Sequence, residues 1–590
     1  MDLRVQKRTL EWLYYLFSQK NEEAARIPFT PSKRALAQDF PKSEPLERSI
    51  PEREGVSSAY IQAFWEGLRQ DPQMHVHTCL ILRHGKVISE GSFAPYRADL
   101  WHATYSVCKS LTGLAIGLLV DEGKLELDDR IVDLLADQAG PLAQLRQSRL
   151  TSRHLLTMTS GVLYNEAASV TEEEWIKGFL ESAVKGKPGE RFQYNSMNSY
   201  VLASIVCRAS GMSLSEYLQE KIFRPMGIRR ILWETSPEGI EKGGWGLYMT
   251  PEDMAKIGQL FLQKGRWKDR QLVSSQWIEK SCEKQVEAGE YGYGYQIWMG
   301  REPGSFQMNG MLGQNIMVFP RTDMVVVTTA GNIELEARCP LAEYIELFFG
   351  EGFHPGEVTE DPAAYQSLRW VQEDPGRIRM PQAAVANRRI LGKNNQSIRS
   401  SQADIRHGIR LLEGQTYRLT RGSAALLPVF IQATQNNFPE PVSRMGFLRE
   451  AGEFWVWMEA GAETYRLRIG LERGCEQKLR IRGEVYWVSV QGDFCQSEDR
   501  ILVLRLRICF LECANERHIK IYLQPDGLVT WWSEVPGPEM ALDAIDVVAA
   551  GGLINTLISR MDPGFFVYKL KKTFQPRLFW EREEEPSDAG

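Results

Sequence analysis

The clearest periodic pattern in the chain is a set of apolar residues that follows Lys109. These residues lie one helical turn apart and would form a single buried face: Leu111, Leu114, Ala115, Leu118 and Leu119. The pattern ends at Asp121-Glu122-Gly123, and glycine suits the position that follows a helix. The chain is therefore predicted to form a buried helix whose first turn contains Ser106.

Apolar strand-like segments flank this helix-rich region on both sides. The predicted strands cover residues 78–82, 86–88, 315–319 and 324–329, and residues 341–349 would form a closing helix. Helix-rich sequence between strands predicts the α+β class, with an antiparallel sheet, flanking helices and a helical subdomain.

The C-terminal part of the chain alternates apolar and polar residues with the period of a half-buried strand. Leu504 and Leu506, for example, alternate with Arg505 and Arg507. The predicted strands there cover residues 454–458, 465–471, 484–490, 501–511, 519–523 and 529–532. Several strands at short spacing predict a separate all-β domain, an antiparallel barrel or sandwich.

Length and shifts in composition divide the chain into four parts, because 590 residues are too many for one core. We expect an N-terminal helix and arm at 1–55, the α+β domain at 56–352, a helix and linker at 353–411, and the all-β domain at 412–590. Residues 376–410 are rich in arginine, which we interpret as a solvated linker. A docking patch for an acidic partner is the alternative.

Charge and cysteine content narrow the classes of function. The formal net charge of −6 gives no reason to expect a nucleic-acid partner. The nine cysteines show no paired C-x-x-C zinc spacing, and their odd number argues against a complete disulfide framework. We therefore expect reduced, mostly buried thiols, no metal site and no cofactor.

The apolar segments also bear on where the protein acts. No segment approaches the ~20 apolar residues of a membrane span, and no cleavage site follows the first amphipathic helix. We expect a cytoplasmic protein without an integral membrane segment. Peripheral membrane contact by the first helix is the alternative.

Ser106 and Lys109 are the first candidates for chemistry. They lie on the same face at the start of the predicted helix, where unsatisfied N–H groups favour an oxyanion. A desolvated lysine can take the proton of a serine hydroxyl and so activate it as a nucleophile. A Ser-x-x-Lys tetrapeptide alone is weak evidence, because most examples are ordinary helix starts.

Two further segments could complete a site. Tyr194 follows a Pro-Gly turn and precedes a predicted helix, and a phenol near a lysine can act as a general base or acid. Asn309-Gly310-Met311 leads into the strand at 315–319, whose backbone could supply an oxyanion donor. Taken separately, Tyr194 would be a packed aromatic and the glycine part of a hairpin turn.

In this order, five segments resemble the motifs of the serine β-lactamase and penicillin-binding-protein-like superfamily. They are residues 105–110 with 121–129, 154–161, 194–196, 244–250 and 310–314. The likeness is greatest to the class C-like esterase, amidase and D-peptidase branch, which includes the 6-aminohexanoate-dimer hydrolase type. It covers about residues 50–350 and implies the serine β-lactamase-like fold.

The resemblance implies roles for individual residues. Ser106 would be the acylated nucleophile, Lys109 its activating amine, and Tyr194 a partner in proton transfer. The N–H groups of Ser106 and Met311 would form the oxyanion hole. The substrate pocket would include Ser196, Asn309, Gly310 and Gln314, with Ser196 occupying a position where many relatives have asparagine.

The third motif departs from the family pattern. It usually begins with Lys or His followed by Thr, whereas this chain has Met308 and Asn309. A methionine cannot pair with the carboxylate of a β-lactam, which argues against penicillin as the substrate. We expect a serine hydrolase acting on a small-molecule ester or amide. An acyltransferase using the same acyl-enzyme, or an inactive binding or sensor protein, are the alternatives.

Overall fold

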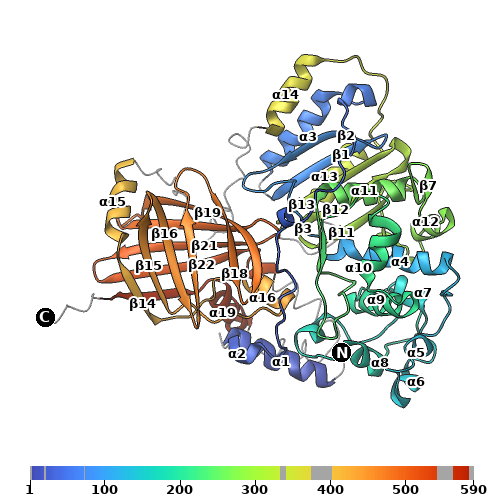
Figure 1. Ribbon diagram of the computed structural model, residues 1–590, viewed down its shortest axis with the longest axis horizontal. Helices are drawn as coiled ribbons and strands as arrows, with labels where there is room; N and C mark the ends of the chain where they lie inside the picture. The colour runs from blue at the N-terminus through green and yellow to red at the C-terminus, as the bar shows by residue number, and fades with distance from the viewer. Residues whose placement is uncertain are drawn as a thin grey trace. The chain divides into compact units, whose positions relative to one another are not determined.

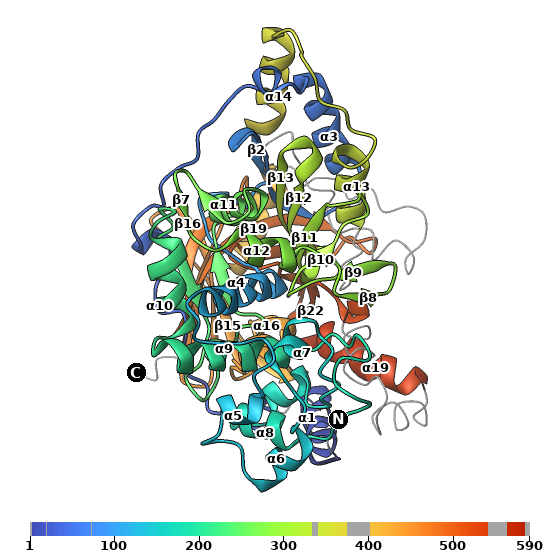
Figure 2. The ribbon, with the colours of Figure 1, turned by 90° about the vertical axis from the view of Figure 1, so that its right-hand side faces the viewer.

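The computed structural model describes residues 3–18, 21–71, 73–332, 340–373, 402–540 and 563–583 (Figures 1 and 2). The chain divides into two compact units. The first comprises residues 1–6 and 37–382, and the second comprises residues 7–36 and 383–590. Most of the predicted linker at 376–410 lies outside the described residues, although Arg406 and Arg410 lie in the helix α15 (Gln402–Leu412).

The first unit is built on an antiparallel sheet of eight strands, which confirms the predicted α+β class. In spatial order the strands are β2 (Lys86–Ser92), β1 (Val76–Arg83), β13 (Met324–Ala330), β12 (Gln314–Phe319), β11 (Phe306–Gly310), β10 (Trp298–Met299), β9 (Tyr291–Tyr293) and β8 (Val286–Ala288). The predicted strands are thus part of one sheet, in which β1 and β13 pair directly although they lie far apart in sequence.

Each face of this sheet is covered by helices, because its strands are apolar on both sides. Met317 and Phe319 pack into a core with α3 (Ser58–Gln70) and α13 (Pro340–Phe349), the predicted closing helix. Ile316 and Val318 point to the other face and join the larger core. That core includes the helices α4 (Cys108–Asp121), α9 (Ser196–Ser210) and α11 (Pro251–Leu262).

The helix α4 is more deeply buried than its periodic pattern predicts. Every residue from Cys108 to Leu119 is buried, so the helix crosses the core with no solvent face. Ser106 lies just before it, in the short 3-10 helix η3 (Tyr105–Val107). Burial of α4 therefore fixes the position of the residues at its N-terminal end.

The second unit confirms the separate all-β domain. Its ten antiparallel strands follow one another around the sheet in chain order, and the first, β14 (Thr416–Arg421), pairs with the last, β23 (Arg577–Arg582). The others are β15 (Arg444–Glu450), β16 (Glu453–Ala460), β17 (Glu463–Ile469), β18 (Cys475–Ile481), β19 (Glu484–Gln496), β20 (Leu502–Phe510), β21 (Glu516–Gln524) and β22 (Gly527–Val535). Hydrogen bonds of Gly470 with Val490 and Gly492 join the β17 and β19 sides and make a near-barrel.

Helices and an N-terminal segment complete the second unit. Its helices include most of α1 (Leu3–Phe17), α2 (Asn21–Ala24), α15, α16 (Val429–Gln435) and α19 (Pro563–Phe574). Lys33 is fully buried, and its Nζ donates to Glu512 Oε2 at 2.5 Å. Its backbone N–H donates to Glu484 at 3.0 Å. Residues 7–36 are thus bound to the barrel as a structural strap.

Two global properties follow from the described residues. None of their helices combines the length and the apolar character needed to cross a membrane. They also contain no cluster of three or more His, Cys, Asp or Glu side chains that could hold a metal ion.

Candidate active site

Ser106 and Lys109 are joined directly by a hydrogen bond. Lys109 Nζ lies 2.8 Å from Ser106 Oγ, as expected for residues three apart at a helix start. Lys109 is only 2% exposed, whereas Ser106 is half-buried and can be reached from outside. The arrangement places a shielded amine against a reachable hydroxyl.

A glycine-rich loop provides the second partner of Lys109. Its Nζ donates to the carbonyl oxygen of Gly244 at 2.7 Å. A Cβ atom at Gly244 would lie 2.7 Å from the carbonyl oxygen of Ser196, at the start of α9. Only glycine therefore lets this loop pass between α9 and Lys109. Both partners of the amine are neutral oxygens, which accept a hydrogen bond from either an amine or an ammonium group.

Tyr194 lies beside the same amine. Lys109 Nζ is 4.9 Å from the centroid of the Tyr194 ring. Tyr194 directly precedes Asn195, the N-cap of α9, whose side chain accepts from the N–H of Met197 at 2.9 Å. The cap fixes where the helix begins and hence where the tyrosine emerges. Three segments distant in sequence, carrying Ser106, Tyr194 and Gly244, thus meet around one lysine.

The backbone before Ser106 is held in a strained conformation against the third motif. Tyr105 has φ = +47°, in a region that non-glycine residues rarely adopt. A Cβ at Gly310 would lie 2.2 Å from the Thr104 carbonyl oxygen and 3.3 Å from the N atom of Ser106. The glycine therefore allows the end of β11 to touch the backbone of Ser106, and Met311 follows immediately.

Two other predicted pocket residues, Gln314 and Asn309, are buried and make hydrogen bonds inside the protein. Gln314 is fully buried, and its amide bonds the backbone of Met311 and of Ala330 at 2.9–3.0 Å. It braces the loop that carries Met311. Asn309 is buried and donates to Asn315 Oδ1 at 2.8 Å, on the sheet face opposite to Met308.

Ser196 and Met308 are also inside the protein. Ser196 is the first residue of α9, and its N–H donates to Glu166 Oε1 at 2.6 Å. Met308 is 1% exposed and packs in the large core. Sequence reasoning missed Glu166 and the carbonyl of Gly244, because neither residue type signals its contact and both contacts are long-range.

Comparison with known proteins assigns a family to part of the first unit. Residues 61–345 match the family model described as Beta-lactamase. These residues contain the three segments that meet around Lys109 and all eight strands of the sheet in the first unit. Residues 61–345 form a Beta-lactamase family domain.

Relatives of the Beta-lactamase domain have several activities in their names. A 6-aminohexanoate-dimer hydrolase of Paenarthrobacter ureafaciens is 28% identical over 280 residues, covering 42% of this chain and 70% of that protein. A monacolin J acid methylbutanoyltransferase of Aspergillus terreus is 32% identical over 158 residues, covering 23% of this chain and 38% of that protein. The solved structure of a penicillin-binding protein homologue from Caulobacter crescentus has a TM-score of 0.41 and 17% identity, covering 49% of this chain and 94% of that one. The family model and the curated relatives place the domain in a serine hydrolase-like family.

An aromatic cluster in the Beta-lactamase domain borders the amine. Tyr194 stacks on Trp298 with 5.9 Å between ring centroids, and Phe192 meets the same indole at 5.5 Å. Tyr293 lies beneath, 4.8 Å from Trp298. Burial raises the pKa of Tyr293 well above its usual value, and the neighbouring Tyr194 adds to the shift. Tyr293 is therefore a neutral packing residue, and the half-buried Phe192 and Trp298 form an apolar wall beside Lys109.

Proposed function

We propose that the protein is a serine hydrolase that cleaves an ester or amide bond of a small molecule through an acyl-enzyme on Ser106. The observation that carries this proposal is the 2.8 Å contact between Lys109 Nζ and Ser106 Oγ in a site reachable from outside. A base in direct contact is what a serine hydroxyl needs to become a nucleophile.

In the acylation step, Ser106 Oγ attacks the substrate carbonyl carbon and its proton passes to Lys109. The carbonyl oxygen becomes an oxyanion, which would accept hydrogen bonds from the N–H groups of Ser106 and Met311. The close packing of Gly310, the residue before Met311, against the backbone of Ser106 supports this pairing.

Acylation is complete when the bond to the leaving group breaks. The leaving group takes up a proton through Lys109 and Tyr194, and the acyl group stays on Ser106. Water then attacks the ester carbonyl while the same two residues accept its proton. The bond between Ser106 Oγ and the acyl carbon breaks, the two residues return a proton to Oγ, and the free acid leaves. No charged group is required of the substrate.

The chemistry of the pocket supports a neutral substrate. Met308 occupies the position where relatives resembling this chain carry a cation, and it is buried in the core. The neighbouring wall of Phe192, Tyr194 and Trp298 is aromatic. We therefore propose that uncharged esters or amides are hydrolysed and that penicillin is not the substrate.

Acyl transfer is a second candidate reaction. The similarity to a monacolin J acid methylbutanoyltransferase favours it, since an acyl-enzyme can react with an alcohol or amine in place of water. Product analysis of a p-nitrophenyl ester reaction, with and without an alcohol acceptor, separates the two. A transesterified product that outweighs the free acid would identify a transferase.

The test of the proposal combines a covalent probe with activity. A fluorophosphonate probe should label Ser106, as located by peptide mass spectrometry, and Ser106→Ala should abolish both labelling and ester hydrolysis with little change in melting temperature. The substitution removes one oxygen at a half-buried position, so the fold should persist. An intact wild-type protein without an adduct would instead be a binding or sensor protein.

A further inference from the structure

The outer wall of the barrel carries a ladder in which cations and aromatic rings alternate. We define the ladder as Tyr522, Trp531, Arg577, Phe579 and Arg421, on the strands β21, β22, β23 and β14. The Tyr522 and Trp531 rings lie 5.9 Å apart. The Arg577 guanidinium lies 5.4 Å from the Trp531 ring and 5.1 Å from the Phe579 ring, and Arg421 lies 5.4 Å from Phe579.

Strand register shows that the ladder is on the solvent side. Trp531 pairs with Arg577, and Arg421 pairs with Phe579. The residues adjacent to Trp531, namely Thr530 and Trp532, are buried inside the barrel, so Trp531 points outward and is 45% exposed. Arg577 and Arg421 are exposed as well.

The ladder is positively charged. Among the residues that the structure describes, no carboxylate lies within 4.0 Å of Arg421, Arg577 or the adjoining Lys520. Lys520 pairs with Trp531 on one side and with Arg505 on the other. Burial lowers the pKa of Lys520, and the charge of Arg505 lowers it further. Arg505 is itself paired with Asp493, whereas Arg421, Arg577 and Lys520 have no carboxylate partner among the described residues. These three cations belong to a protein whose net charge is −6.

On a second aromatic face of the same barrel, the charges of the arginines are balanced by carboxylates. Trp455 and Trp457 on β16 also carry arginines over their rings. There, each arginine holds a carboxylate: Arg466–Glu450 at 2.6 Å, Arg444–Glu459 at 3.0 Å and Arg468–Glu453 at 4.0 Å. Cross-strand packing alone therefore does not require the charges of the ladder to be left unpaired.

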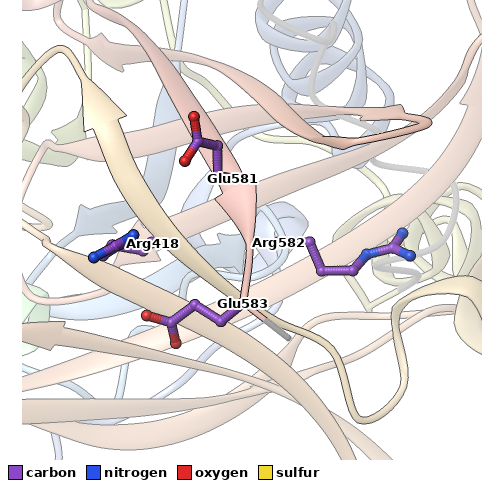
Figure 3. A pocket seen from close by; sticks show the side chains of 4 residues that line it. All are labelled: Arg418, Glu581, Arg582 and Glu583. Carbon is purple, nitrogen blue, oxygen red and sulfur yellow. The ribbon is translucent and has the colours of Figure 1, made fainter. Parts of the chain in front are cut away.

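A hollow in the barrel differs from the ladder in its charge. It measures about 330 Å³ and is lined by Arg418, Glu581, Arg582 and Glu583 (Figure 3). Two cations and two carboxylates balance there, and Arg582 points away from Arg418 and Glu583 in Figure 3. Among the described residues, the unbalanced charge lies on the wall and not in this hollow.

We propose that the ladder, together with Lys520, docks the protein on the anionic headgroups of a phospholipid bilayer. Unpaired cations offer N–H donors to phosphate oxygens, and an exposed tryptophan is suited to the headgroup level. A flat membrane fits the outer wall of a barrel. A single-stranded nucleic acid fits less well, because Arg577 already covers the rings on which bases would stack.

The experiment uses the full-length protein and sedimented vesicles of two compositions. Vesicles containing about one third phosphatidylglycerol should bind the protein at low salt and release it as salt rises, whereas pure phosphatidylcholine vesicles should not bind it. Arg577→Glu replaces an exposed positive charge by a negative one, a change of two charge units. At the usual free energy per charge near an anionic surface, it should weaken binding about 30-fold. Arg421→Glu, on a neighbouring strand, should weaken it comparably.

The matched control is Arg480→Glu. Arg480 is an exposed arginine on β18, outside the ladder, and carries no ion pair among the described residues. This variant has the same net charge as Arg577→Glu and should bind like the wild type. Trp531→Ala should lower binding at every salt concentration without changing the salt dependence, because it removes no charge.

Three results would overturn the proposal. They are absence of binding to phosphatidylglycerol vesicles, an equal loss in Arg480→Glu, and an oligonucleotide that binds with the same dependence on Arg577 and displaces the vesicles. The last result would assign the ladder to nucleic acid. Melting temperature and probe labelling of Ser106 establish that each variant is folded.

Discussion

At the scale of single residues, the site combines a shielded amine with an apolar wall. Lys109 is anchored by Gly244 on one side and Ser106 on the other, so its Nζ has little freedom to move. Tyr194 has two parts with separate uses. Its ring packs on Trp298, and its hydroxyl would transfer protons in the proposed mechanism.

Tyr194→Phe tests the hydroxyl alone. The ring and its stacking remain, so substrate binding should persist while kcat falls by about 10²- to 10⁴-fold, the usual loss for a general acid or base. Trp298→Ala is the matched comparison, because it removes wall surface and should raise KM more than it lowers kcat. Steady-state kinetics on a p-nitrophenyl ester separate the two effects. Unchanged kcat in Tyr194→Phe would remove the phenol from the mechanism.

At the scale of elements, the loop at Gly244 couples α9 to the lysine. Gly244→Ala should lower activity strongly, because its Cβ would meet the Ser196 carbonyl at 2.7 Å and push the Gly244 carbonyl off Lys109. Overpacking of this kind costs about 1–3 kcal/mol of unfolding free energy. Kinetics and thermal melting measure both effects.

Gly140→Ala is the control for this prediction, since nothing lies within 4 Å of a Cβ there and its φ is ordinary. It should leave both activity and melting temperature unchanged. If Gly244→Ala also left activity and melting temperature unchanged, the carbonyl of Gly244 would have no part in positioning Lys109 Nζ.

Met308 gives a second prediction at this scale. Met308→Lys places a charge among the core residues of β11, and an unpaired buried charge costs several kcal/mol. We expect a marked drop in melting temperature and no gain in acylation by penicillin. Met308→Leu, which conserves volume, should cost less than about 1.5 kcal/mol. A stable lysine variant acylated by penicillin would show that the side chain reaches the pocket.

The sequence could indicate the contacts that lie within one element, and little beyond them. The Ser106–Lys109 contact is set by helical spacing, and the strand segments are visible as alternating apolar residues. The contact of Lys109 with Gly244 joins residues 135 positions apart, and no local pattern encodes it. The same holds for the stacking of Trp298 on Tyr194, and for Gln314, whose amide bonds backbone where a pocket residue was predicted.

At the scale of the whole molecule, the strap at residues 7–36 is tied to the barrel by buried charge. Burial alone would lower the pKa of Lys33, but the carboxylates, above all Glu512, outweigh it and raise the pKa. A raised lysine pKa means that the stabilisation is complete below the unfolded value of about 10.4 and is lost only as pH rises through the folded value. The ion pair of Lys33 with Glu512 therefore stabilises the strap fully at neutral pH.

Lys33→Met should destabilise the barrel by about 3–5 kcal/mol, because Glu512 would remain buried without its cation. The double variant Lys33→Met, Glu512→Gln should recover part of this loss. Calorimetry should show the barrel transition moving while ester hydrolysis at moderate temperature is retained. Equal stability of the single variant and the wild type would mean that the pair contributes nothing.

The closure of the barrel has a consequence for biogenesis. Its first strand pairs with its last, and its strap precedes the Beta-lactamase domain in the chain. During synthesis on the ribosome, the Beta-lactamase domain is complete before β14 has emerged, whereas the barrel must wait for β23. The nascent strap meanwhile has no partner for Lys33. The barrel is thus expected to close only after β23 has emerged, when the Beta-lactamase domain has already folded.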